Sequence, residues 1–291
     1  MSAWRALVTG ANGFVGSALL RAAAAAGIEA TGVTRRDTDY SPRSIAALVD
    51  AARVDFVFHG AGSASVAASM QDPAADLASS VDLFGRVLEG VRLSARRPRV
   101  IFPSSAAVYG NAARQPIAEA TPLAPISAYG FHKEVCERLA AEYAGCFGVP
   151  ALVLRIFSLV GEGQRRLLAW ELYRQYRESP EVVLAGTGSE ERDYLHVDDC
   201  ASLVWRGAAA LQEPFVALNM ASGTSVRVAD LAKRMGRMLS ADKPVRCLGQ
   251  ARAGDPVLWR ADVTRLKALA PGLAALDFDA RLREVLDAWS R

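Results

Sequence analysis

Near the N-terminus the sequence reads Thr9-Gly10-Ala11-Asn12-Gly13-Phe14-Val15-Gly16. The apolar run before it, residues 4–9, favours a buried parallel strand, and the Leu- and Ala-rich residues 14–26 after it favour a helix. A glycine-rich turn of this kind brings backbone N–H groups and the positive end of a helix to one point, which suits a pyrophosphate. The glycine spacing differs from the standard Gly-x-Gly-x-x-Gly fingerprint, so an ordinary strand–helix turn is the alternative.

Strands and helices alternate along the first half of the chain. Strands are predicted at residues 30–34, 54–58, 99–102 and 149–156, and helices at 43–53, 74–95 and 128–147. This alternation is typical of an α/β fold with a doubly wound parallel sheet, the Rossmann arrangement.

After Phe157 the elements become shorter and richer in Gly and Pro. Helices are predicted at 166–178 and 197–211, and strands at 180–184 and 215–220. We expect this half to form a smaller, non-contiguous C-terminal substrate lobe. The expected division is residues 1–157 with about 195–220 for the dinucleotide-binding Rossmann domain, and 158–194 with 221–291 for the substrate-binding lobe.

The composition argues against several classes of protein. The net charge is +3 over 291 residues and the charges are scattered, so nothing favours nucleic acid as a partner. No secretory signal or membrane-spanning stretch is evident, which predicts a cytoplasmic protein without a membrane partner. The four cysteines form no Cys-x-x-Cys pair and the three histidines lie far apart in the sequence, so no metal site is expected.

The first motif supplies the expected contacts to a dinucleotide. Gly10 permits the tight turn, Gly13 lets the backbone approach the pyrophosphate, and Gly16 lets the helix pack on the strand. Further along, the Asp39 carboxylate can accept from the adenine amino group while Tyr40 covers the ring. A plain loop at these last two residues is the alternative.

The end of the second predicted strand bears on the choice between the two dinucleotides. An acid there accepts from a ribose 2′-hydroxyl and repels a 2′-phosphate, whereas arginines favour the phosphate. Thr34 occupies the position of the acid, and Arg35 and Arg36 follow it, so NADP is the expected cofactor and NAD the alternative. In that alternative both arginines point to solvent and Asp37 binds the ribose.

A second motif follows the fourth predicted strand and reads Ser104-Ser105-Ala106-Ala107-Val108-Tyr109-Gly110. Downstream lies Tyr129-Gly130-Phe131-His132-Lys133. Tyrosine, with a pKa of about 10, is a poor base at neutral pH, but a lysine ammonium on the same helix face stabilises a phenolate. Ser105 would hydrogen-bond the substrate oxygen and hold it against Tyr129. The pattern indicates an enzyme that moves hydride between a nicotinamide and an alcohol carbon.

These motifs resemble those of the extended short-chain dehydrogenases/reductases, in particular the NAD(P)-dependent nucleotide-sugar epimerase/dehydratase family. Further matching stretches are His59-Gly60-Ala61-Gly62, Leu154-Arg155-Ile156-Phe157-Ser158 with Gly161, Arg192-Asp193-Tyr194-Leu195-His196-Val197-Asp198-Asp199, and Gly254-Asp255-Pro256-Val257-Leu258-Trp259-Arg260-Ala261-Asp262. The resemblance covers nearly the whole chain. It implies an enzyme of carbohydrate biosynthesis that acts on a nucleoside-diphosphate sugar and forms a homodimer through residues 74–95 and 128–147.

The resemblance also implies roles by position. The catalytic residues would be Ser105, Tyr129 and Lys133. The residues that would bind the cofactor are Gly10, Asn12, Gly13, Phe14, Val15, Gly16, Arg35, Arg36, Asp39, Tyr40, Gly60, Ala61, Gly62, Ser104, Tyr129, Lys133 and Ile156. The residues that would bind the substrate are Ser63, Ser105, Ala106, Ser158, Arg192 and Arg252.

Two of these residues, Arg192 and Arg252, would clamp the diphosphate, because a planar guanidinium suits phosphate geometry. The alternative for Arg192 is an ion pair with Asp193 or Glu190. The alternative for Arg252 is a solvated charge on a loop.

Two departures from the family pattern narrow the expected reaction. Family dehydratases carry an acid pair just after the catalytic hydroxyl residue, where this chain has Ala106-Ala107, which argues against sugar 4,6-dehydration. Ser158 stands where the family often has Asn, so that substrate contact must differ. The leading hypothesis is an epimerase, and the second is an NADPH-dependent reductase of a nucleotide-linked keto-sugar, favoured by Arg35-Arg36. A non-catalytic dinucleotide sensor is disfavoured because the tyrosine and lysine are both present.

Overall fold

The structure is a computed structural model that describes residues 4–250, 254, 256–272 and 277–291. Its largest sheet is six-stranded and parallel, with the order β2-β1-β3-β4-β5-β9. The strands are β1 (Trp4–Thr9), β2 (Ile28–Val33), β3 (Phe56–His59), β4 (Arg99–Ser105), β5 (Ala151–Ile156) and β9 (Phe215–Met220). Every residue of β5 is buried, as expected for an internal strand covered on both faces.

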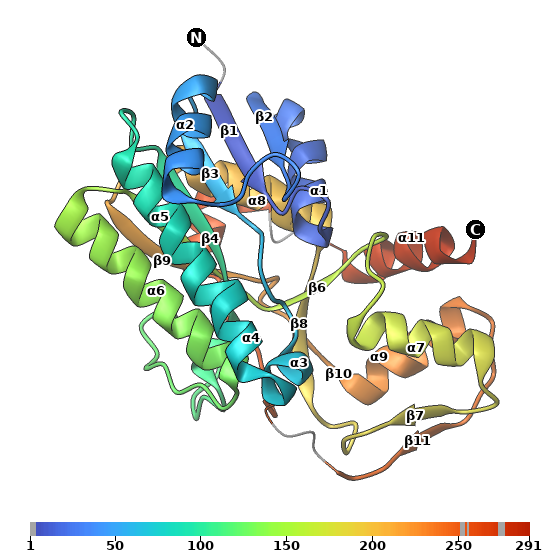
Figure 1. Ribbon diagram of the computed structural model, residues 1–291. Helices are drawn as coiled ribbons and strands as arrows, with labels where there is room; N and C mark the ends of the chain where they lie inside the picture. The colour runs from blue at the N-terminus through green and yellow to red at the C-terminus, as the bar shows by residue number, and fades with distance from the viewer. Residues whose placement is uncertain (1–3, 251–253, 255, 273–276) are drawn as a thin grey trace.

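Helices cover both faces of this sheet, so the doubly wound α/β fold is confirmed (Figure 1). One face carries α1 (Phe14–Ala23) and α8 (Val197–Ala210), and the other carries α2 (Pro42–Ala52), α5 (Leu83–Leu93) and α6 (Ala128–Phe147). On the first face the indole Nε1 of Trp205 donates to the Leu19 carbonyl at 3.0 Å. On the second face Ile45 and Phe84 are fully buried in one apolar cluster.

The segment predicted as one helix over residues 74–95 is interrupted by a different helical turn. It comprises α4 (Pro73–Leu77), a π-helical turn at Ala78–Asp82 and α5, and it follows α3 (Val66–Gln71). The π turn packs against the loop after β3, where a Cβ on Gly62 would lie 2.8 Å from the Ser79 carbonyl oxygen. Such turns are frequent at functional sites, and this one lies beside the predicted cofactor loop.

Two other differences from the predicted boundaries have local causes. β2 ends at Val33 because the next residue, Thr34, turns back and donates its backbone N–H to Asp37. β4 continues beyond residue 102 to Ser105, because Ser104 and Ser105 stay in register with β5.

A smaller part of the molecule is built mainly from residues after β5 and lies to the right in Figure 1. It contains a three-stranded sheet of β6 (Ser158–Val160), β8 (Glu191–His196) and β10 (Ser225–Arg227), and the pair β7 (Val182–Leu184) and β11 (Val245–Cys247). Its helices include α7 (Leu167–Glu178), α9 (Val228–Met238) and α11 (Phe278–Ser290), while α10 (Thr264–Leu269) packs near β9. Tyr173 and Tyr176 of α7 are buried in this part's own apolar core, and the Tyr173 hydroxyl donates to the Trp289 carbonyl at 2.7 Å.

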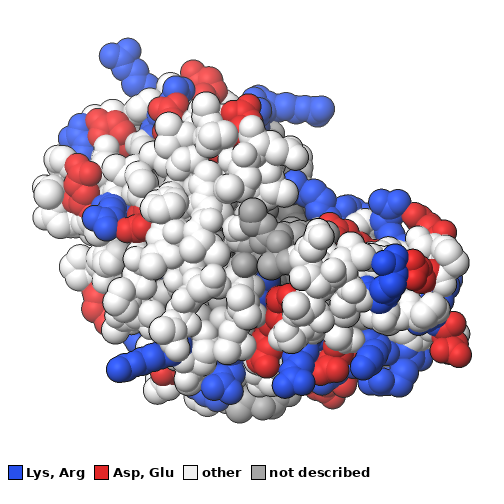
Figure 2. All heavy atoms as spheres, turned by 90° about the horizontal axis from the view of Figure 1, so that it is seen from below, with Lys and Arg blue, Asp and Glu red and all other residues white. Residues whose placement is uncertain are grey.

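Charged residues are unevenly spread over the face seen from below (Figure 2). The side formed by the helices of the large sheet is mostly uncharged there, whereas the smaller part carries Lys, Arg, Asp and Glu intermixed. Among the described residues, no helix has the length and apolar character needed to cross a membrane.

The order of the strands creates a crevice between the carboxyl ends of β1 and β3. The chain leaves β1 toward β2 on one side and later returns to β3 on the other, which is the switch point where α/β sheets bind ligands. The two strand ends approach so closely that a Cβ on Gly10 would lie 2.5 Å from the Gly60 carbonyl carbon. Gly10 also has a φ of +67°, a backbone conformation that residues other than glycine rarely adopt.

His59, the last residue of β3, lies beneath this crevice. It is fully buried, its Nδ1 is 3.0 Å from the Thr9 hydroxyl, and its ring stacks on Phe84. Burial lowers the pKa of His59 to about 3, so its imidazole is neutral in the folded protein.

This buried histidine predicts an acid-sensitive stability. Below its ordinary pKa of 6.5 the unfolded chain binds a proton that the folded chain rejects, so stability is lost as the pH falls. Between pH 6.5 and about pH 5 this residue should remove about 2 kcal/mol from the unfolding free energy. Urea unfolding gives the unfolding free energy of the wild type and of His59→Asn at several pH values across this range. The free energy should fall more steeply with decreasing pH in the wild type than in the variant, and an equal fall in both would contradict the prediction.

Candidate active site

The turn after β1 has the geometry of an anion site. The Gly13 N–H donates to the Gly10 carbonyl at 2.8 Å, and α1 begins directly afterwards. No side chain caps the start of α1, and its first turn contains no acidic residue. A Cβ on Gly16 would lie 2.3 Å from the Gly10 carbonyl oxygen, so helix and turn are as close as the backbone allows. The residues therefore fit a dinucleotide pyrophosphate held by backbone N–H groups and the helix dipole.

At the end of β2 a carboxylate, not a guanidinium, is held in place. Asp37 accepts from the backbone N–H and the hydroxyl of Thr34, at 2.8 Å and 2.7 Å. These bonds lower the pKa of the Asp37 carboxyl below its usual value. The side chains of Arg35 and Arg36 are exposed to solvent. The edge that would meet the ribose therefore carries a fixed negative charge.

The contacts expected from Asp39 and Tyr40 require correction. The Asp39 carboxylate accepts from the Ser41 N–H at 2.8 Å and from Ser44, which lowers its pKa to about 2 and commits it to the start of α2. Tyr40 is only 4% exposed and belongs to the apolar core under the sheet, so its ring does not face a bound adenine. Local sequence gives no sign of this, because the partners of Tyr40 belong to the distant apolar cluster and its φ of +59° is rare for residues other than glycine.

The two halves of the second motif meet at the end of β4. Ser105 is the last residue of that strand, and its hydroxyl accepts from the Ala107 N–H at 3.2 Å. Tyr129 lies in the first turn of α6, where Ser127 caps the helix. The Lys133 ammonium is 5.6 Å from the centre of the Tyr129 ring and donates to the Pro103 carbonyl at 2.8 Å. The lysine thus lies behind the tyrosine ring, with its charge buried near the strand end.

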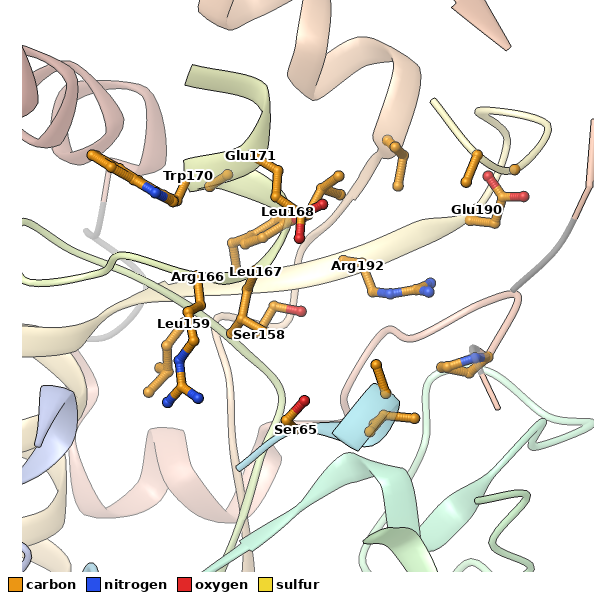
Figure 3. A pocket seen from close by; sticks show the side chains of 18 of the residues that line it. Ser65, Ser158, Leu159, Arg166, Leu167, Leu168, Trp170, Glu171, Glu190 and Arg192 are labelled. Carbon is orange, nitrogen blue, oxygen red and sulfur yellow. The ribbon is translucent and has the colours of Figure 1, made fainter. Parts of the chain in front are cut away.

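A cavity of about 650 Å³ opens between the large sheet and the smaller part. Four residues expected at the site line it: Ser105, Tyr129, Ser158 and Arg192. Figure 3 shows Arg166 on one side of Ser158 and Arg192 on the other, with Ser65 below Ser158. The hydroxyls of Ser105 and Tyr129 line one side of the cavity, and the guanidinium groups of Arg166 and Arg192 line another. This combination suits a polar ligand that carries a phosphate.

Arg192 is available to such a ligand. Its guanidinium lies 5.4 Å from the centre of the Trp259 ring and donates to the Glu191 carbonyl. The alternative ion pairs are absent from the described residues, because Asp193 accepts instead from Gly223 and neighbouring donors and Glu190 accepts from Thr187 and Gly188.

Two residues predicted at the substrate site, Ala106 and Ser63, are not among those that line the cavity. Ala106 is completely buried, and its neighbour Ala107 lines the cavity instead. Ser63 is not among the lining residues, whereas Ser65 is. Ser104, expected at the cofactor, is buried and donates its hydroxyl to a glutamate of α6. Arg252 lies outside the described residues.

Residue patterns alone missed the partner of that serine. Glu137 lies four residues after Lys133, so a helix places both on one face, and Arg155 follows from β5. Glu137 and Arg155 form a buried ion pair at 2.7 Å. The repeated spacing from Tyr129 through Lys133 to Glu137 was the available signal.

Comparison with known proteins places the chain in a family. The model of the NAD dependent epimerase/dehydratase family matches residues 6–220. A UDP-glucose 4-epimerase from Azospirillum brasilense is 29% identical over 305 residues, which cover 90% of this chain and 85% of that protein.

Solved structures agree with this match. MoeE5 in complex with UDP-glucuronic acid and NAD is 26% identical, with a TM-score of 0.89 and 99% of both chains covered. A UDP-galactose 4-epimerase is 27% identical, with a TM-score of 0.83 and 98% of both chains covered. The resemblance indicated by the motifs is confirmed, and the chain belongs to the NAD dependent epimerase/dehydratase family.

Proposed function

We propose that the protein is an NAD-dependent epimerase that inverts C4 of a UDP-hexose. The observation that carries this proposal is that Ser105 and Tyr129 line one cavity with Arg192, while Lys133 lies behind the tyrosine ring. The similar UDP-glucose and UDP-galactose 4-epimerases support the position on the sugar and the choice of nucleotide.

In the proposed reaction the side chains of this chain handle the proton of the C4 hydroxyl. Ser105 hydrogen-bonds the oxygen, and Tyr129 removes the proton as a general base. The Lys133 ammonium stabilises the resulting phenolate. When bound, the nicotinamide supplies the hydride acceptor and, on return, the hydride donor. Tyr129 then returns the proton to the same oxygen, so no net proton or hydride is consumed.

The division of the chain predicted from the sequence fits this reaction. Residues 1–157 with about 195–220 would hold the dinucleotide, and residues 158–194 with 221–291 would hold the sugar nucleotide. Arg192 would bind the diphosphate, because its guanidinium is already oriented by Trp259 and the Glu191 carbonyl.

Dehydration lacks a proton donor in the expected place. Ala106 and Ala107 stand just after Ser105, and both are buried. Among the described residues, the acidic side chains that line the cavity are Glu171 and Glu190, which both belong to the smaller part. Glu190 accepts three hydrogen bonds from its own turn, which keep its carboxylate ionised.

We propose NAD rather than NADP as the cofactor, contrary to the preference drawn from Arg35 and Arg36. The support is the carboxylate of Asp37, fixed on Thr34 at the end of β2, which would repel a 2′-phosphate. The complex of the similar protein MoeE5 contains NAD.

We also propose a homodimer formed through α3, α4 and α6. These helices pack together, and the large apolar side chains that they expose include Met70, Leu77, Phe131 and Val135. Exposed apolar side chains gathered on adjacent helices are typical of an interface.

The proposed reaction predicts interconversion without net redox change. With bound NAD the protein should convert UDP-galactose to an equilibrium mixture with UDP-glucose. Tyr129→Phe should lower kcat by about 10²–10⁴-fold because the general base is lost, while NAD still binds. Chromatography of the sugar nucleotides measures turnover. Consumption of NADPH with a keto-sugar, without epimerisation, would favour the reductase hypothesis instead, and unchanged activity in Tyr129→Phe would refute the site.

The cofactor proposal predicts that NAD binds roughly tenfold or more tightly than NADP, as measured by calorimetry. Asp37→Ala should lower the ratio of the NADP and NAD dissociation constants, because it removes the charge that repels the 2′-phosphate. The matched variant Asp50→Ala changes an acid outside this edge and should leave the ratio unaltered. Tighter binding of NADP by the wild type would overturn the proposal.

The dimer proposal predicts that Leu77→Glu combined with Val135→Glu yields monomers, because two charges would be buried at the interface. The control is Leu248→Glu, since Leu248 is exposed to the same extent as Leu77, 49% against 47%, but lies after β11. Light scattering after gel filtration gives the mass. A wild-type monomer, or a double variant that stays dimeric, would contradict the proposal.

A further inference from the structure

The ion pair between Glu137 and Arg155 is buried beside the candidate site, and neither residue is among those that line the cavity. Only 4% and 8% of the two side chains are exposed. Arg155 donates to the carboxylate from its terminal nitrogen at 2.7 Å and from Nε at 3.1 Å. A buried pair of this kind contributes little to stability compared with apolar side chains of similar volume. We therefore ask which neighbouring side chains the pair holds in position.

The glutamate end of the pair holds the residue before Ser105. The hydroxyl of Ser104 donates to Glu137 Oε1 at 2.5 Å. One turn earlier on the same helix face, the Lys133 ammonium donates to the Pro103 carbonyl at 2.8 Å. The two residues that precede Ser105 are thus each bonded to α6.

The arginine of the pair bonds to Tyr109, which lies four residues after Ser105. Arg155 donates from its other terminal nitrogen to the Tyr109 hydroxyl at 2.9 Å, and its guanidinium lies 5.0 Å from the centre of that ring. Tyr109 is completely buried and donates in turn to Asn219 at 2.7 Å. It is the last residue of the short 3₁₀ helix Ala106–Tyr109, which begins directly after Ser105.

The polar groups form a row across the sheet. Ser104, Arg155 and Asn219 are register neighbours on β4, β5 and β9. Internal strands of parallel sheets are normally apolar, since each buried polar group must find a partner. A row of three such residues, all hydrogen-bonded, indicates a requirement for defined geometry rather than for burial.

We propose that Glu137 and Arg155 are positioning residues for the reaction at Ser105 and Tyr129. The pair holds both ends of the segment 104–109, while Glu137 belongs to the helix that carries Tyr129. It therefore fixes the serine hydroxyl relative to the tyrosine. This inference rests on the proposed function, because it assumes that both hydroxyls act on one substrate oxygen.

The test removes both charges together, so that neither is left buried and unpaired. In Glu137→Leu with Arg155→Met, kcat should fall by about 10²-fold, the loss expected for a misplaced catalytic group. KM and the dissociation constant for NAD should change less than roughly threefold, since the cavity and the glycine turn are untouched. Amide hydrogen exchange should rise at residues 106–109, a readout that needs no activity.

A milder variant keeps the test decisive if the double variant does not fold. Tyr109→Phe removes one hydroxyl and should lower kcat by roughly tenfold in a protein that still folds, with a lower unfolding midpoint because Asn219 loses its donor. The control for the double variant is Arg281→Met with Asp199→Leu. It removes a different ion pair, at 2.6 Å between α11 and α8, and should leave kcat unchanged.

Two results would overturn the inference: unchanged kcat in a folded variant, or a fall in kcat matched by an equal loss of NAD affinity. If the wild type itself shows no epimerisation, the proposed function fails, and hydrogen exchange still decides the positioning role. Unchanged exchange at residues 106–109 in the double variant would then refute it.

Discussion

The contact between one face of α6 and the end of β4 determines the candidate site. Tyr129, Lys133 and Glu137 follow one another at single-turn intervals along this face. Lys133 and Glu137 bond to the strand end, so the first of the three residues is placed by the other two. A helix bonded twice to a strand cannot slide or rotate without breaking buried hydrogen bonds. The serine at the strand end and the tyrosine of the helix therefore have one defined arrangement.

A second constraint is the close approach of backbone to backbone at the crevice. Gly10 and Gly60 touch across β1 and β3, and α1 lies directly on the turn at Gly16. No side chain can stand at these points, so the N–H groups remain accessible to a ligand. Beneath the crevice His59 is held neutral by burial, so the positive field at the turn comes from backbone N–H groups and the start of α1 and not from this side chain.

The two parts of the molecule contribute different chemistry to one cavity. Ser105 at the end of β4 and Tyr129 of α6 bring the two proposed catalytic hydroxyls, and the smaller part brings Arg166 and Arg192. Asp193 anchors β8 from inside: it is completely buried and accepts four hydrogen bonds from Ser222, Gly223 and Ala261. Burial raises the pKa of Asp193 to about 6, and the four donors still favour its charged form. Arg192 thereby extends into the cavity from a rigid strand.

Local patterns in the sequence were sufficient for the α/β class, for the glycine turn, and for the tyrosine and lysine one helical turn apart. Each depends on neighbouring residues and on a fixed backbone period, so the chain carries it without reference to distant parts. The tertiary structure decided four features: the burial of Tyr40, the burial of Ala106, the hydrogen bond from Ser104 to Glu137, and the orientation of Arg192. Each depends on which distant segments meet in the fold. For Ser104 the sequence carries one local sign, the four-residue spacing from Lys133 to Glu137, but that spacing does not show that β4 lies against this helix face.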